Sequence, residues 1–242
     1  MREWFEDWFD QDYAAIYAAR DAGEAAAAVA MALGAAPSLA RGPVLDLACG
    51  AGRHLEALRR VNPLAFGLDL SRDLLDLAPR DLRPWLVRAD MRALPLREGS
   101  LSGICMWFTP FGYFSDAENV ALLRRLGALL APGGVLVLDY LNARHLREHL
   151  VPEDEQEAGG IHVVNRRTLE GQRVVKRMVL TRLATGARRT VTESVRLYEP
   201  EEMEALAADA GLGVFARAGG YDGADFDPAR SGRWIGFLRK VV

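Results

Sequence analysis

Two glycines follow a short apolar run near residue 50 of this 242-residue chain. Gly50 and Gly52 come directly after residues 44–48, and a helix-like stretch begins at Arg53. Glycine lets the backbone approach a ligand closely, and free N–H groups at a helix start attract an anionic group. Asp69 lies 19 residues after Gly50, near the offset of about 20 residues at which a carboxylate hydrogen-bonds a ribose. The spacing favours a ribose-containing ligand; an ordinary turn and a carboxylate that only faces a helix dipole are the alternatives.

The segment departs from the fingerprint of dinucleotide-binding proteins. Leu55 stands where that fingerprint needs a third small residue, and an acidic residue inside the strand is not part of it. Residues 44–53 instead resemble, almost continuously, motif I of the class I S-adenosylmethionine-dependent methyltransferases. The resemblance implies that this loop surrounds the methionine part of S-adenosylmethionine. The residues implied are Asp46, Ala48, Gly50, Gly52 and Arg53.

Two more acidic residues fit the same family pattern in order along the chain. The resemblance assigns Asp69 to the ribose of the cofactor and Leu70 to one face of the adenine. It also implies that Asp90 accepts a hydrogen bond from the adenine amino group, while Met91 offers its backbone N–H and apolar packing. Phe108, at the end of the expected fourth strand, completes the predicted cofactor contacts.

An aromatic stretch, residues 107–114, lies where this family brings its substrate to the methyl group. Thr109 and Tyr113 are candidate hydrogen-bonding partners of the acceptor, and core packing around a Pro-Gly turn is the alternative. Methyl transfer is a direct displacement that mainly needs alignment and exclusion of water. We therefore assign no catalytic side chain, and none of the four histidines can be placed in the site from sequence.

Aromatic residues near the start of the chain have helical spacing. Aromatic residues recur there at three- and four-residue spacing, which predicts one amphipathic helix with an aromatic face. They are Trp4, Phe5, Trp8, Phe9, Tyr13 and Tyr17. In related small-molecule methyltransferases such a helix closes over cofactor and substrate, so Tyr13 and Tyr17 are candidate lid residues. Ordinary packing of the helix is the alternative.

The elements that must position these residues follow the pattern of βαβ units from residue 43 onward. Predicted strands are 44–48, 64–69, 85–89, 101–108, 135–140, 212–216 and 234–241, with helices starting near 53, 71, 117 and 201. The resemblance implies an α/β, Rossmann-like sheet of seven strands, parallel except for the last. Residues 161–169, 173–183 and 189–198 predict an inserted three-stranded antiparallel meander. We divide the chain into an N-terminal helical cap (1–42), a methyltransferase core (43–150 and 199–242) and the insert (151–198).

Composition is that of a globular protein. There are 30 basic and 33 acidic side chains, a net charge of −3, and half of the residues are hydrophobic. The apolar run at residues 25–36 is too short to span a bilayer, and the start of the chain lacks the features of a signal peptide. Cys49 and Cys105 do not suffice for a disulfide scaffold. We expect a soluble cytoplasmic protein that needs no metal.

Charge is unevenly distributed. Residues 2–12 carry five acidic side chains against one arginine, whereas residues 161–196 carry nine basic side chains against two glutamates. This basic block is compatible with an acidic acceptor, with RNA, or with a half-exposed sheet.

These observations predict an S-adenosylmethionine-dependent methyltransferase that acts on a nitrogen or oxygen nucleophile of a small molecule. The position of the insert, together with residues 111–114, loosely resembles the bacterial small-molecule N-methyltransferases of amino sugars and glycine-like amines. An RNA or protein methyltransferase, and a cofactor-binding module without turnover, are the alternatives. We expect no nucleic acid or membrane partner, and a homodimer is compatible with the insert.

Overall fold

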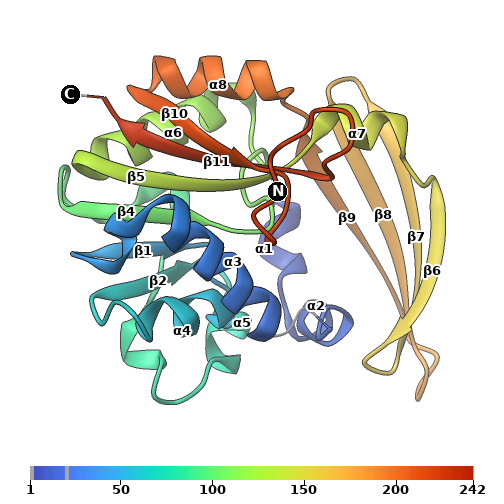
Figure 1. Ribbon diagram of the computed structural model, residues 1–242. Coiled ribbons are helices and arrows are strands. Elements are labelled where there is room, and N and C mark those ends of the chain that lie inside the picture. Colours follow the sequence, from blue (N-terminus) through green and yellow to red (C-terminus); the bar gives the residue numbers. More distant parts are fainter. Residues whose placement is uncertain (1–2, 20–21, 242) are drawn as a thin grey trace.

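The computed structural model describes residues 3–19 and 22–241 and contains a seven-stranded central sheet (Figure 1). The strand order is β10-β11-β5-β4-β1-β2-β3. Its strands are β1 (Val44–Leu47), β2 (Ala65–Asp69), β3 (Leu86–Arg88), β4 (Leu101–Met106), β5 (Leu130–Leu141), β10 (Leu212–Ala218) and β11 (Arg233–Lys240). Only β11 runs against its neighbours, since it pairs antiparallel with both β5 and β10. The predicted α/β sheet with an antiparallel last strand is confirmed.

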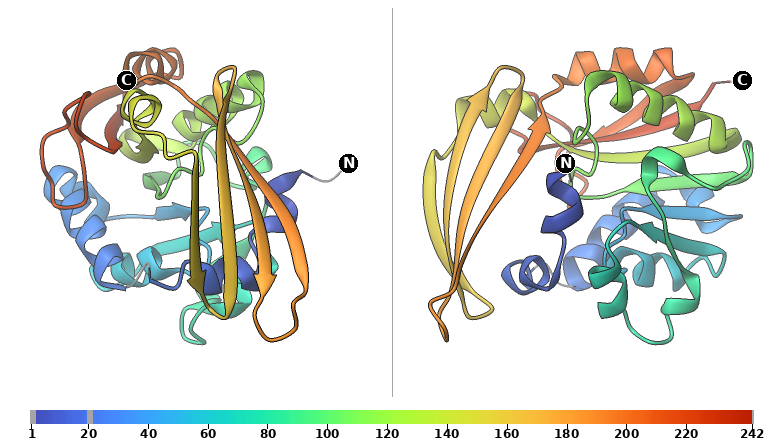
Figure 2. Two further views of the ribbon diagram at one scale, coloured as in Figure 1. Left: turned by 90° about the vertical axis from the view of Figure 1, so that its right-hand side faces the viewer. Right: turned by 180° about the vertical axis from the view of Figure 1, so that it is seen from behind.

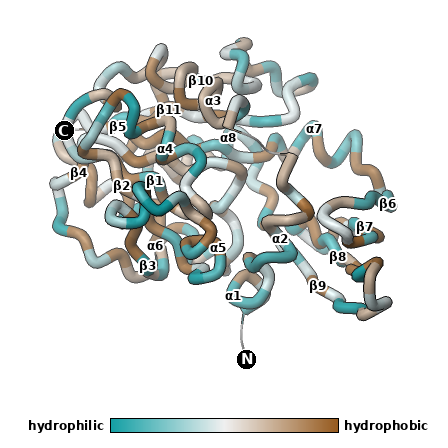
Figure 3. The backbone as a smooth tube through the Cα atoms, turned by 90° about the horizontal axis from the view of Figure 1, so that it is seen from below, coloured by the Kyte–Doolittle hydropathy of each residue, from teal (hydrophilic) through white to brown (hydrophobic). Residues whose placement is uncertain are grey.

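Helices cover both faces of this sheet (Figures 1 and 2). The helices of the core are α3 (Ala22–Ala35), α4 (Arg53–Arg59), α5 (Arg72–Leu77), α6 (Asp116–Leu129), α7 (Ala143–Glu148) and α8 (Pro200–Asp209), with 3-10 turns at Pro37–Ala40, Arg83–Trp85 and Met91–Ala93. Side chains of β1 alternate between two cores: Leu45 and Leu47 pack with residues of α6 and α8, whereas Val44 packs with α3 and α4. Burial on both faces explains the continuous apolar runs of the central strands, which Figure 3 shows as hydrophobic stretches.

A second sheet stands beside the central one (Figure 2). It contains four antiparallel strands, β6 (Glu153–Ala158), β7 (Ile161–Glu170), β8 (Arg173–Arg182) and β9 (Arg188–Arg196), in that order. The prediction of three strands was therefore wrong by one. β6 reads Glu-Asp-Glu-Gln-Glu-Ala, a poor strand sequence on intrinsic propensity. It forms a strand because all six of its residues pair with β7. Its acidic side chains meet polar partners there, and Asp154 accepts from both Asn165 and Arg167.

The N-terminal segment lies between the two sheets (Figures 1 and 2). It forms two short helices, α1 (Trp4–Trp8) and α2 (Gln11–Ile16), so the prediction of one continuous helix was wrong. Asp10 causes the break, because its side chain accepts hydrogen bonds from the backbone N–H groups of Asp12 and Tyr13 at 2.9 and 3.2 Å and caps the second helix. Trp8 and Ile16 are buried against the second sheet, in a small core of their own.

Candidate active site

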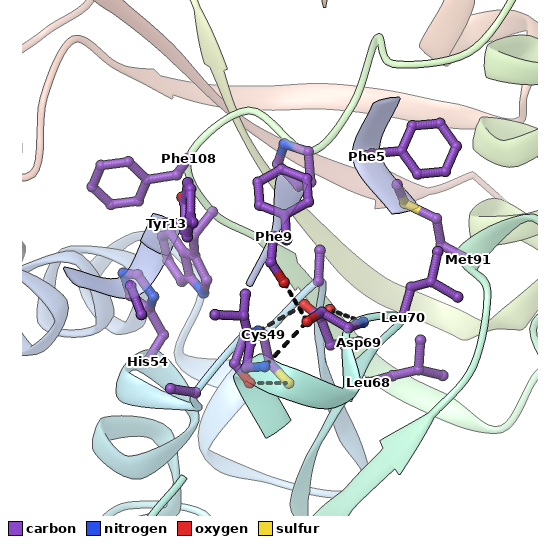
Figure 4. Close-up of a pocket in the computed structure, with 18 of the residues that line it drawn as sticks. Phe5, Phe9, Tyr13, Cys49, His54, Leu68, Asp69, Leu70, Met91 and Phe108 are labelled. Carbon is purple, nitrogen blue, oxygen red and sulfur yellow. Dashed lines mark hydrogen bonds between the residues drawn. The ribbon is translucent and has the colours of Figure 1, made fainter. Parts of the chain in front are cut away.

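A cavity of about 340 Å³ opens at the carboxyl ends of the central strands, beneath the N-terminal helices (Figure 4). This is the edge at which open α/β sheets bind ligands. It brings together most of the residues that the sequence singles out. Those that line it are Tyr13, Tyr17, Ala48, Gly50, Arg53, Asp69, Leu70, Asp90, Met91, Phe108 and Tyr113.

The glycine loop between β1 and α4 has a backbone that ordinary residues rarely adopt. Ala48, Gly50 and Gly52 all have positive φ, at 60°, 55° and 82°. A Cβ on Gly52 would stand 2.5 Å from a methyl group of Leu82, so glycine is needed there for space as well as conformation. Two N–H groups of the loop are used within the protein, since Gly50 donates to the Asp69 carboxylate and Gly52 donates to the backbone oxygen of Cys49.

Asp69 ends β2 and holds this loop in place. Its carboxylate accepts hydrogen bonds from the backbone N–H groups of Gly50 and Ser71, both at 2.8 Å (Figure 4). Burial raises the pKa of this carboxyl, and the N–H groups that point at it offset part of the rise. A carboxylate has about four acceptor sites, so two N–H partners leave capacity for hydroxyl donors from the cavity.

Asp90 reaches the cavity from the end of β3 and is paired with Arg92. The guanidinium donates to both carboxylate oxygens, and Nη2 lies 2.7 Å from Oδ2. Partial burial raises the pKa of Asp90, but the hydrogen bonds and charge of Arg92 outweigh it and hold the pKa below its ordinary value. Asp90 is therefore a fixed, ionised acceptor at the cavity wall.

Three predicted site residues do not line the cavity. Gly52 shapes the loop from behind, as described above. Thr109 is buried, and its hydroxyl accepts a hydrogen bond from Arg233 at 3.0 Å. Asp46 is fully buried inside β1, and neither of its oxygens has a hydrogen-bond partner of ordinary geometry among the described residues. Burial, and then the nearby Asp69 carboxylate, raise the pKa of Asp46 to about 8. The structure thus gives Asp46 and Thr109 no direct contact with a ligand in the cavity.

His54 lines the cavity, a position that sequence reasoning did not assign to it. It is buried on α4, and its ring stacks on Trp107 with centroids 5.0 Å apart and planes at 14°. Burial, and then the neighbouring Arg53, lower the pKa of His54 to about 3, so the ring is neutral at physiological pH. The only sequence signal was its position directly after the glycine loop.

Asp139 is a second buried polar residue beside the cavity wall that sequence reasoning missed. It is fully buried at the end of β5, and its carboxylate accepts hydrogen bonds from the Phe108 N–H at 2.7 Å, the Tyr221 hydroxyl and the Arg233 guanidinium. A charged residue inside an otherwise apolar strand was the signal that could have found it.

Aromatic side chains of the N-terminal helices form the opposite wall of the cavity. Tyr13 and Tyr17 pack against each other at 4.8 Å, and Trp4 packs on Tyr113 at 4.7 Å between ring centroids. Lys176 of β8 donates a hydrogen bond of 2.6 Å to the Tyr17 hydroxyl. The lid segment, residues 3–17, thus meets the second sheet at the rim of the cavity.

The uneven charges of the sequence meet at the same place. Arg182 pairs with Asp12, and Arg189 pairs with Asp10 and Asp12. Arg173 donates to the backbone oxygens of residues 112–114 and so holds the aromatic loop after β4. Much of the basic block therefore positions the lid and the cavity wall.

Within the described residues, no helix has the length and apolar character needed to cross a membrane. In the same part of the chain, no group of three or more His, Cys, Asp or Glu side chains is arranged to hold a metal ion.

Comparison with known proteins agrees with this geometry. Residues 44–134 match a family described as "Methyltransferase domain". The chain is 32% identical over 190 residues to dTDP-3-amino-3,6-dideoxy-alpha-D-glucopyranose N,N-dimethyltransferase of Streptomyces fradiae, a match that covers 74% of this chain and 73% of that protein.

Solved structures show the same fold. A methyltransferase from Clostridium acetobutylicum superposes with a TM-score of 0.78 at 16% identity, covering 92% of this chain and 93% of that one. Streptomyces venezuelae DesVI superposes with a TM-score of 0.69 at 27% identity, covering 93% and 95%. The chain belongs to the class I S-adenosylmethionine-dependent methyltransferases, and S-adenosylmethionine is its methyl donor. Within that class it is related to the sugar N,N-dimethyltransferases.

Proposed function

We propose that this protein methylates the amino nitrogen of an amino sugar. The observation that carries the proposal is the similarity to the Streptomyces fradiae enzyme over about three quarters of both chains. CalS10 of Micromonospora echinaspora, described as an amino pentose methyltransferase, supports it at 26% identity over 88% of both chains. A single cavity that joins the glycine loop to a tyrosine-lined lid has room for donor and acceptor side by side.

The cofactor would occupy the end of the cavity formed by the central sheet. We assign the ribose to Asp69, because its carboxylate has acceptor capacity beyond the two N–H groups that it already binds. The adenine would lie between Leu70 and Met91, with Asp90 toward its amino group. The methionine end would meet the loop of Ala48 and Gly50 and the neighbouring Arg53.

The acceptor would enter at the lid, where Tyr13, Tyr17 and Tyr113 line the cavity. S-adenosylmethionine supplies a methyl group on a positively charged sulfur, which makes the methyl carbon electrophilic. The acceptor nitrogen would bond to that carbon as the carbon–sulfur bond breaks, so that S-adenosylhomocysteine leaves and the proton lost from nitrogen passes to solvent water. The tyrosine hydroxyls orient the amine, and the aromatic rings of the lid exclude water. Lys176 fixes the hydroxyl of Tyr17 at this rim.

The division of the chain into cap, core and insert stays a prediction. Within the cap range of 1–42, α3 packs with β1 and α4 of the core. The insert would serve as a frame, because Arg173 holds the loop after β4 and Lys176 holds the lid. We place the reaction in the cytoplasm, where the free thiols of Cys49 and Cys105 remain reduced.

Release of S-adenosylhomocysteine in the presence of paired acceptors tests the proposal. The dTDP-linked 3-amino-3,6-dideoxyglucose should support turnover. Its matched control, with a hydroxyl in place of the 3-amino group, should not. Equal turnover with both sugars, or none with a panel of amino sugars, would contradict the assignment.

A further inference from the structure

The wall of the cavity after β4 has an unusual backbone. Phe108 and Thr109 both have positive φ, at 61° and 62°, and neither is glycine. Consecutive left-handed residues that carry side chains are disfavoured, and they persist only where surrounding contacts enforce them. The two residues turn the chain so that the Phe108 ring lines the cavity while Thr109 is buried behind it.

Asp139 supplies the contacts that enforce this turn. Its carboxylate accepts the Phe108 N–H at 2.7 Å, and its backbone oxygen accepts the Thr109 N–H at 3.0 Å. The neighbouring strand adds Arg233, which pairs with the carboxylate and donates to the Thr109 hydroxyl at 3.0 Å. Tyr221, on the loop between β10 and β11, donates its hydroxyl to the same carboxylate. Asp139 therefore holds Phe108 through its carboxylate and Thr109 through its backbone oxygen. The carboxylate also joins this turn to Arg233, near the end of the chain.

The Phe108 ring is the part of this wall that meets the glycine-loop end of the cavity. The guanidinium carbon of Arg53, the first residue of α4, lies 4.5 Å from the centroid of the ring. The His54 ring lies 6.0 Å away. A change in the backbone at Phe108 would therefore move the ring that packs against the start of α4.

We propose that Asp139 is a positioning residue for cofactor binding, acting through the left-handed turn at Phe108 and Thr109. Asp139 does not line the cavity, so its effect passes through the Phe108 ring and not through contact with the ligand. The inference rests on the assignment of the glycine-loop end of the cavity to the cofactor.

A double-mutant cycle tests the proposal, with S-adenosylhomocysteine as the calorimetric probe. We expect Asp139→Asn to weaken its affinity by about tenfold, because an amide cannot accept from all three donors and the turn relaxes. Thr109→Gly should change the affinity by less than about threefold, since glycine adopts positive φ without strain. In the double variant the glycine should recover most of the loss.

Two outcomes overturn the proposal: unchanged affinity in Asp139→Asn, or a loss that Thr109→Gly does not reduce. If Asp139→Asn does not fold, Tyr221→Phe can replace it in the same cycle. This variant leaves the ion pair between Asp139 and Arg233 intact. It removes one donor to the carboxylate, and we expect about a threefold loss with the same rescue. Asp154→Asn is a matched control, since Asp154 accepts from Arg167 in the second sheet, and it should bind as the wild type does.

The role of Asp139 and the assignment of the cavity to the cofactor can be tested separately. Wild-type protein must bind S-adenosylhomocysteine, and Asp69→Ala must lose that binding, if the cavity holds the cofactor. Should Asp69→Ala bind normally, the cavity assignment fails. Should it lose binding while Asp139→Asn does not, only the role of Asp139 fails.

Discussion

Replacement of Asp69 by asparagine perturbs the centre of the proposed cofactor site. The carboxylate accepts two backbone N–H groups at 2.8 Å, and an asparagine side chain presents one oxygen and one NH₂ in the same space. One N–H would therefore lose its acceptor and face a donor. A hydrogen bond to a charged group contributes about 1.5–3 kcal/mol, so we expect the free energy of unfolding to fall by about that amount.

The same change removes an acceptor for the ribose. Loss of one charged hydrogen bond of about 1.5–3 kcal/mol corresponds to an affinity for S-adenosylhomocysteine that is weaker by about 10- to 150-fold. Isothermal titration calorimetry measures the affinity, and urea unfolding measures the stability. Asp73→Asn is the matched control, because Asp73 is exposed in the first turn of α5 and should affect neither quantity strongly. Affinity within twofold of wild type in a folded Asp69→Asn variant would refute the reasoning.

Three further predictions concern the lid and the buried acid of β1. Lys176→Met should lower kcat by about tenfold, because the Tyr17 hydroxyl loses a charged donor at 2.6 Å. Tyr17→Phe should lower kcat by a similar factor. Steady-state kinetics of the double variant should show no further loss of kcat. Arg189→Gln breaks the partly exposed pair with Asp10, so KM for the acceptor should rise about two- to fivefold at low salt and the difference should shrink at high salt. The free energy of unfolding of Asp46→Asn, measured with urea, should rise relative to that of the wild type as pH increases from about 4 to 8. The expected gain is on the order of several kcal/mol.

The direction of the pH effect follows from where the proton is bound. Burial and the Asp69 carboxylate raise the pKa of Asp46 to about 8 in the folded protein, whereas the unfolded chain releases this proton near pH 4. Protonated Asp46 therefore contributes fully to the stability of the wild type below about pH 4, and this contribution is lost as pH rises to about 8. Asparagine does not titrate. A stability difference that stays constant over this range would contradict the raised pKa.

The lid predictions have their own controls. Arg166→Gln removes an exposed ion pair with Glu153 at the far strand of the second sheet, and it should leave KM and its salt dependence unchanged. A salt dependence that is identical in wild type and Arg189→Gln would argue against electrostatic docking of the lid. Additive losses in the Lys176 and Tyr17 variants would show that the two side chains act separately.

Much of the central sheet could be predicted because its signals are local. The apolar runs of β1 and β5 are continuous, and Gly50 and Gly52 mark a turn that few other residues could form. Asp69 is the last residue of β2, and Asp90 comes two residues after the end of β3. The parallel order of β1, β2 and β3 therefore brings both to one edge of the sheet. Local sequence and sheet topology therefore suffice to place these residues together.

Other features depend on partners far away in the chain. The acidic strand β6 forms through pairing with the basic side chains of β7, and its own sequence argues against a strand. The cap at Asp10 divided a helix that hydrophobic spacing alone predicted to be continuous. The sequence shows Asp139 only as a charged residue in an apolar strand. Its hydrogen-bonding role becomes visible once its partners Phe108, Tyr221 and Arg233 are known. For β6 and Asp139, tertiary contacts decide the outcome. The Asp10 cap is instead a local contact with residues 12 and 13, which aromatic spacing alone does not reveal.

Charge distribution gives a related lesson. The acidic start of the chain and the Arg-rich insert looked like separate surfaces, one of them suited to RNA. In the fold they form ion pairs with each other, through Arg182 with Asp12 and Arg189 with Asp10. The observation that motivated the RNA alternative is accounted for in good part by docking of the lid.

Transfer of an isotopically labelled methyl group tests the central claim most directly. The protein is incubated with S-adenosylmethionine that carries a deuterated methyl group and with dTDP-linked 3-amino-3,6-dideoxyglucose, and the product is fragmented in a mass spectrometer. The account predicts that the label is found on the amino nitrogen of the sugar. A label on a sugar oxygen, or unlabelled sugar after prolonged incubation with protein that binds S-adenosylhomocysteine, would contradict it.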